Sequence, residues 1–168
     1  MTPRIETERL VLRAPVADDF PVYERFYADA AASAAYGGPL NTRQAWRTLA
    51  ADVGHWQLRG YGMWSVIVRE SGKMAGGCGF YWPEGWPRCE LTWWIAPAAR
   101  RQGYALEASR AAIRFAYDTL GWKLVETHMS DENEAARGLA VKLGGRVIAR
   151  EMFPDGRERN VYGLPRGG

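Results

Sequence analysis

At 168 residues the chain has the length of one ordinary domain, and its hydrophobic fraction of 47% is enough to bury a core without disulfide or metal support. No apolar run approaches the roughly 20 residues of a membrane-spanning helix, and the first residues lack the apolar stretch of a secretion signal. We therefore expect a cytoplasmic protein that does not enter a membrane. A net charge of +3 without a basic run argues against nucleic-acid binding and suits a small anionic ligand.

The first half of the chain predicts a strand, two helices and then three strands. Asp18-Asp19 and Asn41-Thr42 favour helix starts, and Gly37-Gly38-Pro39 separates the two helices. Three glycines within residues 76–79 predict a bulge or a close backbone approach. The expected elements are a strand over 9–13, helices over 18–29 and 41–58, and strands over 63–69, 73–82 and 89–95.

The second half alternates helices and strands and ends in a hairpin. Pro97 ends the preceding strand, Gly144-Gly145 ends a helix, and Pro154-Asp155-Gly156 predicts the turn of the hairpin. The expected elements are helices over 103–119 and 133–143, and strands over 123–129, 146–153 and 157–163. Because no linker or repeat interrupts this order, we expect one mixed α/β domain over residues 1–168, with its core at about 6–164. Cys78 and Cys89 lack metal-binding spacing, so no metal site is expected.

The segment Arg100-Arg101-Gln102-Gly103-Tyr104-Ala105 lies between the end of a strand and the start of a helix. A helix N-terminus has free backbone N–H groups and a partial positive charge, so it attracts phosphate. Gly103 has no side chain to keep an anion from the backbone, and the two arginines add formal charge. Taken alone, the pattern fits an ordinary capped helix equally well.

Several motifs, in the right order, resemble those of the GNAT acetyltransferase superfamily. Arg100-x-x-Gly103-x-Ala105 matches the family's Gln/Arg-x-x-Gly-x-Gly/Ala signature, and Asn133 followed by Lys142-Leu143-Gly144 resembles a later helix of the family. Residues 7–13 and Glu107-Ala108 are similar to the branch that includes the ribosomal-protein N-terminal Ser/Ala acetyltransferases. The resemblance implies a mostly antiparallel central sheet, helices on both faces and a splayed pair of parallel strands.

The resemblance also implies acetyl-CoA as the cosubstrate. The residues that would hold its pyrophosphate are Arg100, Arg101, Gln102, Gly103, Tyr104 and Ala105. The exposed backbone at Ile95 and Ala96 would pair with the pantetheine arm, and a strand N–H near Ile95 would polarise the thioester carbonyl. Asn133 would bond the arm or its acetyl-bearing end, or serve simply as a helix cap.

On the acceptor side, Glu90 is the expected base, because a glutamate at this strand position often acts through water in the resembling branch. Strand alternation places Glu90, Thr92 and Trp94 on one face. A surface ion pair is the alternative for Glu90, and Glu84 is a weaker candidate base. An acceptor pocket lined by tryptophans is expected, with core packing as the alternative for each; the candidates are Trp82, Trp86 and Trp94.

Two residues depart from the family pattern. Ala136 replaces a serine, and Ala140 replaces a tyrosine that protonates the departing thiolate; the remaining candidates for that role are Tyr81, Tyr104 and Tyr162. The expected function is direct transfer of acetyl to a primary amine, either a peptide α-amine or a small-molecule amine, since no cysteine occupies an obvious nucleophile position. A regulatory module that binds acetyl-CoA with little or no catalysis is the alternative, and the closing hairpin suggests a possible homodimer.

Overall fold

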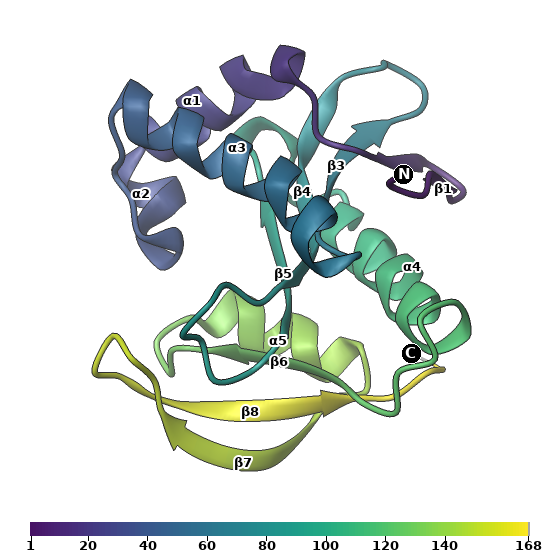
Figure 1. The fold of residues 1–168 in the computed structure, drawn as a ribbon, viewed down its shortest axis with the longest axis vertical. Helices are drawn as coiled ribbons and strands as arrows, with labels where there is room; N and C mark the ends of the chain where they lie inside the picture. The colour runs from purple at the N-terminus through teal and green to yellow at the C-terminus, as the bar shows by residue number, and fades with distance from the viewer. Residues whose placement is uncertain (168) are drawn as a thin grey trace.

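The computed structural model describes residues 1–167 and divides their strands between two antiparallel sheets (Figure 1). The first sheet has the strand order β1-β2-β3-β4-β5, and the second has the order β6-β8-β7. The strands are β1 (Ile5–Glu6), β2 (Leu10–Arg13), β3 (Met63–Val68), β4 (Met74–Tyr81), β5 (Glu90–Ile95), β6 (Val125–Met129), β7 (Arg146–Met152) and β8 (Glu158–Leu164). The mixed α/β class and the mostly antiparallel pairing are therefore confirmed.

Helices cover both faces of the first sheet (Figure 1). On one face, α1 (Phe20–Ala28) and α3 (Thr42–Arg59) share a core with Trp94. On the other, α4 (Tyr104–Asp118) packs with Leu91 and Trp93, in a core that also includes α5 (Glu134–Lys142) and β6. The side chains of β5 thus alternate between two cores, as its sequence predicts. No helix of the described chain is long and apolar enough to cross a membrane.

Helix starts follow the sequence in one case and depart from it in another. Asn41 caps α3 in a reciprocal capping box with Gln44, as expected. Asp19 is the N-cap residue of α1, as expected, but its side chain makes no cap bond, because the carboxylate is buried and accepts from Arg13 at 2.7 Å and from Ser65 at 2.6 Å. The ion pair with the partly exposed Arg13 and the bond from Ser65 thus anchor the start of α1 to β2 and β3.

A short helical segment between α1 and α3 is absent from the sequence prediction. It consists of α2 (Ala30–Ser33) and a turn of 3-10 helix over Ala34–Tyr36. Asp29 caps α2 by accepting from Ala32 N at 3.0 Å. Four residues are too few for a periodic pattern, so only this cap could have indicated the helix.

The glycines of β4 permit the close approach that the sequence predicts. A Cβ on Gly76 would lie 1.9 Å from the carbonyl oxygen of Trp94, and one on Gly79 would lie 2.2 Å from that of Gly62. The pairing of β3 with β4 shifts register between Val66 and Ile67, opposite this segment. Tight packing on β4 fixes one edge of β5 and leaves the other edge facing β6.

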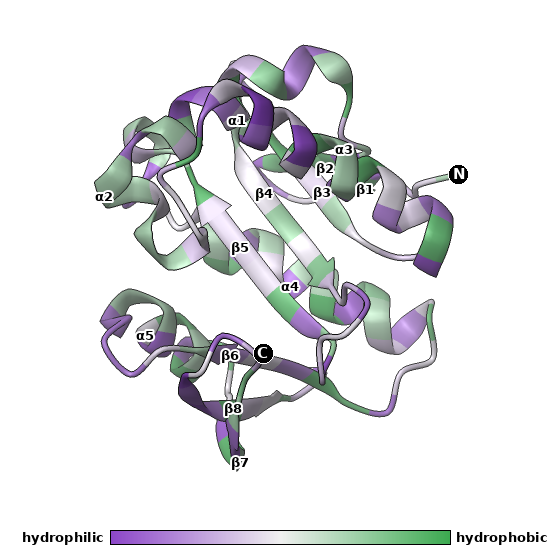
Figure 2. Ribbon diagram, turned by 60° about the vertical axis from the view of Figure 1, so that its left-hand side comes forward, coloured by the Kyte–Doolittle hydropathy of each residue, from purple (hydrophilic) through white to green (hydrophobic). Residues whose placement is uncertain are grey.

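β5 and β6 belong to different sheets but run in the same direction. Arg88 contacts Glu126, and further along both strands Glu90 contacts His128. The buried Thr127 hydroxyl donates to the Leu91 carbonyl at 2.8 Å and holds the strands together at this level. Beyond it the two sheets separate (Figure 2), which gives the splayed parallel pair that the family resemblance implies.

Candidate active site

A cavity of about 1440 Å³ opens where β5 and β6 separate; we call it the cofactor cavity. Its walls come from the end of β5, the loop before α4, the first turns of α4 and α5, and the α2 segment. Most of the residues expected to bind acetyl-CoA line it: Ile95, Arg100, Arg101, Gly103, Tyr104, Ala105 and Asn133. Neither Ala96 nor Gln102 lines it through a side chain.

The loop before α4 has the geometry of an anion cradle. The first N–H of α4 to find an acceptor within the helix is that of Glu107, so those of residues 104–106 are free among the described residues. Gly103 has a φ of 80°, and Arg101, a residue with a side chain, has a φ of 62°. Such paired left-handed turns direct successive N–H groups toward one point, which suits a pyrophosphate.

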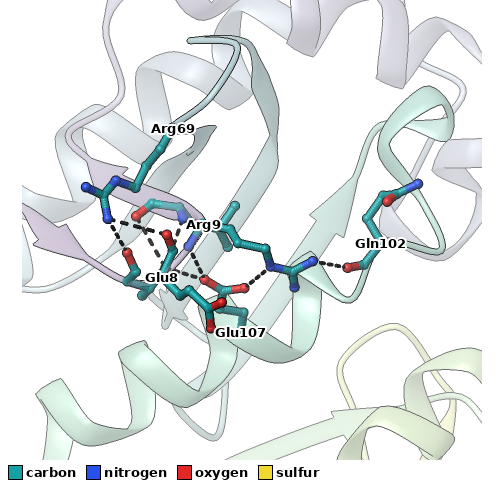
Figure 3. Close-up of polar contacts among 7 residues, drawn as sticks. Glu8, Arg9, Arg69, Gln102 and Glu107 are labelled. Carbon is teal, nitrogen blue, oxygen red and sulfur yellow. Dashed lines mark hydrogen bonds and ion pairs between the residues drawn. The ribbon is translucent and has the colours of Figure 1, made fainter.

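A network of charged side chains holds this loop against the segment before β2 (Figure 3). The Arg9 guanidinium donates to the Gln102 carbonyl at 2.7 Å and to the Glu107 carboxylate at 2.7 Å. Glu107 also accepts from the Thr7 hydroxyl at 2.6 Å. Burial opposes ionisation of Glu107, but the bonds from Thr7 and Arg9 outweigh it and lower the pKa of the carboxyl. The two segments that resemble one branch of the family therefore contact each other.

The free edge of β5 presents three carbonyls toward the split, and each accepts a side-chain bond. Leu91 O accepts from Thr127, Trp93 O from the Tyr36 hydroxyl, and Ile95 O from Arg100 Nε at 3.0 Å. Within residues 1–167 the N–H groups of Trp93 and Ile95 have no acceptor. The Ala96 N–H donates to Ala75 O at 2.8 Å and its carbonyl accepts from Ala99 N at 2.8 Å, so of the backbone expected to pair with the pantetheine arm, Ile95 is free and Ala96 is already bonded.

Asn133 lies where the two sheets separate. Its side chain accepts from Ala136 N at 3.1 Å, which confirms its role as the cap of α5. It also lines the cofactor cavity and a second cavity, described next. Ala140 is fully buried in the core, so this position of α5 supplies packing and no polar group.

The second cavity, of about 680 Å³, lies on the α1–α3 side of β5; we call it the acceptor cavity. Glu90, Trp86 and Trp94 line it as expected. It shares eight lining residues with the cofactor cavity, and the two cavities therefore adjoin at the split. The shared residues are Ala34, Ala35, Tyr36, Trp93, Ser130, Asn133, Ala136 and Arg157.

Glu90 occupies a protected position in the acceptor cavity. Only 14% of its side chain is exposed, and its Oε2 lies 3.2 Å from Nε2 of His128. Burial raises the pKa of Glu90 to about 8, against a smaller opposing effect of Arg159. Burial also lowers the pKa of His128 to about 4, so the histidine is uncharged near neutral pH and the contact is not an ion pair.

Trp82 and Glu84 lie away from the acceptor cavity. The Trp82 ring faces a separate cavity of about 300 Å³, and its indole N–H donates to Trp86 O at 2.7 Å. β4 ends at Tyr81, so strand alternation no longer directs the next side chain, and the expectation that Trp82 lines the acceptor pocket is wrong. Glu84 is 98% exposed and pairs with Arg59, which leaves Glu90 as the carboxylate beside the split.

Sequence reasoning missed three residues of the acceptor cavity: Tyr27, Tyr36 and Asp52. Asp52 is 5% exposed, and burial raises its pKa to about 7, partly offset by a bond from Tyr23. An acid inside the helix 41–58 was the available signal, but the sequence did not reveal which face of that helix would be covered.

A family model for the acetyltransferase (GNAT) domain matches residues 9–146. The chain belongs to the GNAT acetyltransferase family. It is 24% identical to the N-acetyltransferase YoaA of Bacillus subtilis, over 98% of this chain and 97% of that protein. A crystal structure of an acetyltransferase from Agrobacterium tumefaciens is 29% identical, with a TM-score of 0.88 over 98% of this chain and 95% of that one.

A more distant neighbour shows the same fold with coenzyme A bound. It is RimL, a ribosomal L7/L12 α-N-protein acetyltransferase, which is 16% identical with a TM-score of 0.79 over 99% of this chain and all of that one. As a GNAT acetyltransferase, the protein is an acyltransferase that uses acetyl-CoA and acts on amine acceptors. Nothing in these relatives supports the regulatory alternative.

Proposed function

We propose that the protein transfers acetyl from acetyl-CoA directly to a primary amine held in the acceptor cavity. The observation that carries this proposal is that the two cavities adjoin at the split between β5 and β6, where they share eight lining residues. An acyl group delivered from one side can there meet an amine from the other, without an intermediate carrier. Neither cysteine lines these cavities, and burial raises the pKa of each thiol to about 12, so neither is available as a thiolate nucleophile.

In this proposal the loop over residues 100–105 holds the pyrophosphate, and acetyl-CoA supplies a thioester whose carbonyl carbon the amine attacks. The free N–H groups of Trp93 and Ile95 both face the split, about two residue rises apart on the strand, so one donates to the thioester carbonyl oxygen and the other pairs with the pantetheine arm. Asn133 bonds the ligand through the part of its amide that does not cap α5.

Glu90 takes the proton that the amine loses as the C–N bond forms, directly or through one water. A base with a pKa of about 8 is well matched to this task, because it is partly ionised near neutral pH and still strong enough to accept a proton. His128 remains neutral beside it, with Nε2 at 3.2 Å from the Glu90 carboxyl, so no cation lowers the pKa of the base from that side.

Tyr36 assists the departing sulfur in place of the tyrosine that Ala140 replaces. Its hydroxyl lies at the junction of the cavities and donates to Trp93 O. Burial raises the pKa of Tyr36 to about 12, well above that of a thiol at about 8.5, so the tyrosine keeps its proton. It therefore turns its hydroxyl to donate a hydrogen bond to the sulfur as the C–S bond breaks, and solvent supplies the final proton.

Thermal shift with acetyl-CoA and thiol release over a panel of amines test the proposed function. We expect binding together with turnover of at least one class of primary amine, with a loss of about 100-fold in kcat for Glu90→Gln and about tenfold for Tyr36→Phe. Binding of acetyl-CoA without release of thiol by any amine contradicts the proposal and restores the regulatory alternative.

Two further expectations belong to this proposal, a cytoplasmic location and a homodimer. β7 is an edge strand with exposed apolar side chains, Val147 at 53%, Ile148 at 50% and Met152 at 62%. Such an edge favours self-association through the closing hairpin. Sedimentation of the wild-type chain and of Ile148→Lys measures the oligomeric state, and we expect the lysine variant to shift toward the monomer.

A further inference from the structure

The end of the acceptor cavity beneath α3 contains a carboxylate without a positive partner. Asp52 lines the cavity, and the Tyr23 hydroxyl donates to its Oδ2 at 2.8 Å. No other group of residues 1–167 donates to Asp52, and none of the ion pairs of the described chain includes it. A carboxylate removed from water without a cation is costly, so burial raises the pKa of Asp52 to about 7, and a ligand that carries a positive charge into the cavity would stabilise the ionised form.

Two tyrosine hydroxyls near Asp52 also lack partners. Tyr27 is 6% exposed, Tyr81 is half-buried, and both line the acceptor cavity. Neither hydroxyl forms a hydrogen bond within residues 1–167, whereas those of Tyr23, Tyr36 and Tyr117 do. Burial raises the pKa of Tyr27 and of Tyr81, and the charge of Asp52 raises both further, which places the two rings within electrostatic reach of this carboxylate.

The other charged groups of the cavity lie elsewhere or are already paired. Arg47 and Arg157 are exposed at the rim. Arg159 forms an ion pair with Asp155, and His128 is neutral. The two groups inside the cavity that can become negative without a cationic partner of their own are therefore Glu90 beside the split and Asp52 beneath α3, and burial raises the pKa of each.

We propose that the acceptor is a diamine, whose second, protonated nitrogen binds Asp52, Tyr27 and Tyr81 while its first nitrogen reacts beside Glu90. A primary ammonium has three N–H donors, and the carboxylate and two hydroxyls supply three acceptors. The inference rests on the proposed function, because it assigns the acceptor of that reaction.

Steady-state acetylation rates of diamines and of matched monoamines test the proposed binding of a second nitrogen. The probes are α,ω-diaminoalkanes of increasing length, the n-alkylamines with the same numbers of carbons, and the amino alcohols in which a hydroxyl replaces the second amine. We expect one diamine to exceed its matched alkylamine and amino alcohol in kcat/KM by at least about tenfold, since a hydrogen-bonded charge is lost in both controls.

The variants separate recognition from folding. Asp52→Asn keeps the shape of the side chain, and we expect it to reduce kcat/KM for the diamine to near the alkylamine value while the alkylamine changes by less than about twofold. Tyr27→Phe keeps the ring packing and removes one acceptor, so a smaller selective loss is expected. Asp18→Asn, an exposed position outside both cavities, is the matched control.

Each outcome has a separate meaning. Acetylation of alkylamines and diamines at equal kcat/KM overturns the inference and leaves the proposed function standing. An equal loss for both acceptors in Asp52→Asn and Tyr27→Phe also overturns it, because a structural role has no preference for the second nitrogen. If no amine releases thiol although acetyl-CoA binds, the proposed function itself fails.

Discussion

The Glu90→Gln variant is expected to be more stable than the wild type at alkaline pH, by a margin that grows as the pH rises. In the unfolded chain the Glu90 carboxyl ionises near 4.5, whereas burial raises its pKa in the fold to about 8. Between these values the folded state keeps a proton that the unfolded chain has lost, so rising pH favours unfolding. The contribution of Glu90 to stability is thus complete below about pH 4.5 and is lost as the pH rises through about 8. Glutamine keeps the shape and does not titrate.

The size of the effect follows from the shift in pKa. Each unit corresponds to about 1.36 kcal/mol, so the change from 4.5 to about 8 sets an upper limit of about 5 kcal/mol. Because 14% of the side chain stays exposed, water and local relaxation reduce the penalty, and we expect about half of this limit, about 2–3 kcal/mol. For a chain of this size that is about 4–12 °C in Tm.

Urea unfolding of the wild type and of Glu90→Gln, from about pH 5 to about pH 9, measures the difference between their unfolding free energies. We expect the two unfolding free energies to diverge steadily with pH, with the variant more stable at the alkaline end while its turnover is lost. Glu84→Gln is the matched control, because that carboxylate is 98% exposed and should show no such divergence. A difference between Glu90→Gln and the wild type that stays constant with pH would refute the reasoning.

Three further substitutions test the cofactor cavity and the packing of β5. Gly103→Glu places a negative charge in the pyrophosphate cradle, at a position with a φ of 80°. We expect it to weaken the binding of acetyl-CoA at least about tenfold, as measured by calorimetry. Unchanged affinity in a folded variant would contradict the assignment. Arg9→Lys loses the fork that joins Gln102 to Glu107, so the KM for acetyl-CoA should rise about fivefold with little change in kcat, while the exposed Arg4→Lys changes neither. Gly76→Ala would place a Cβ 1.9 Å from a strand carbonyl, so it should lower the free energy of unfolding in urea by about 3 kcal/mol. The control Gly54→Ala places a Cβ that meets nothing within 4 Å and should stabilise α3 slightly.

The cofactor cavity was predictable from sequence because local features build it. The cradle over residues 100–105 needs only a strand end, a glycine and a helix start, and these adjoin one another in the chain. The cap at Asn133 and the close approach at Gly76 are equally local, because each depends on a residue type with a specific backbone role. The bond between Arg9 and Glu107 spans 98 residues, yet the family resemblance brought both segments into the prediction.

The acceptor cavity was harder to predict because its groups come from separate segments. Tyr27, Tyr36 and Asp52 meet Glu90 only when α1, the α2 segment and α3 pack on β5, and no pattern in residues 20–59 specifies that arrangement. Tertiary packing also directs Trp82 away from the cavity, although it lies close in sequence to Trp86. Local chemistry thus predicted the anion cradle and the family resemblance implied the cosubstrate, whereas nonlocal packing decides the acceptor.

The raised pKa of Glu90 should also be visible in catalysis. A base must be ionised to accept a proton, so kcat/KM is expected to rise with pH and level off above about 8. The ionisation of the acceptor would produce a similar rise, and an amine that is already neutral over the whole range removes this ambiguity. With such an acceptor the profile reports the enzyme alone, and Glu90→Gln should show a low rate without the rise. A wild-type profile that is flat from about pH 6 to about pH 9 would mean that Glu90 is not the base. Glu90 would then lower the free energy of unfolding at alkaline pH without contributing to turnover.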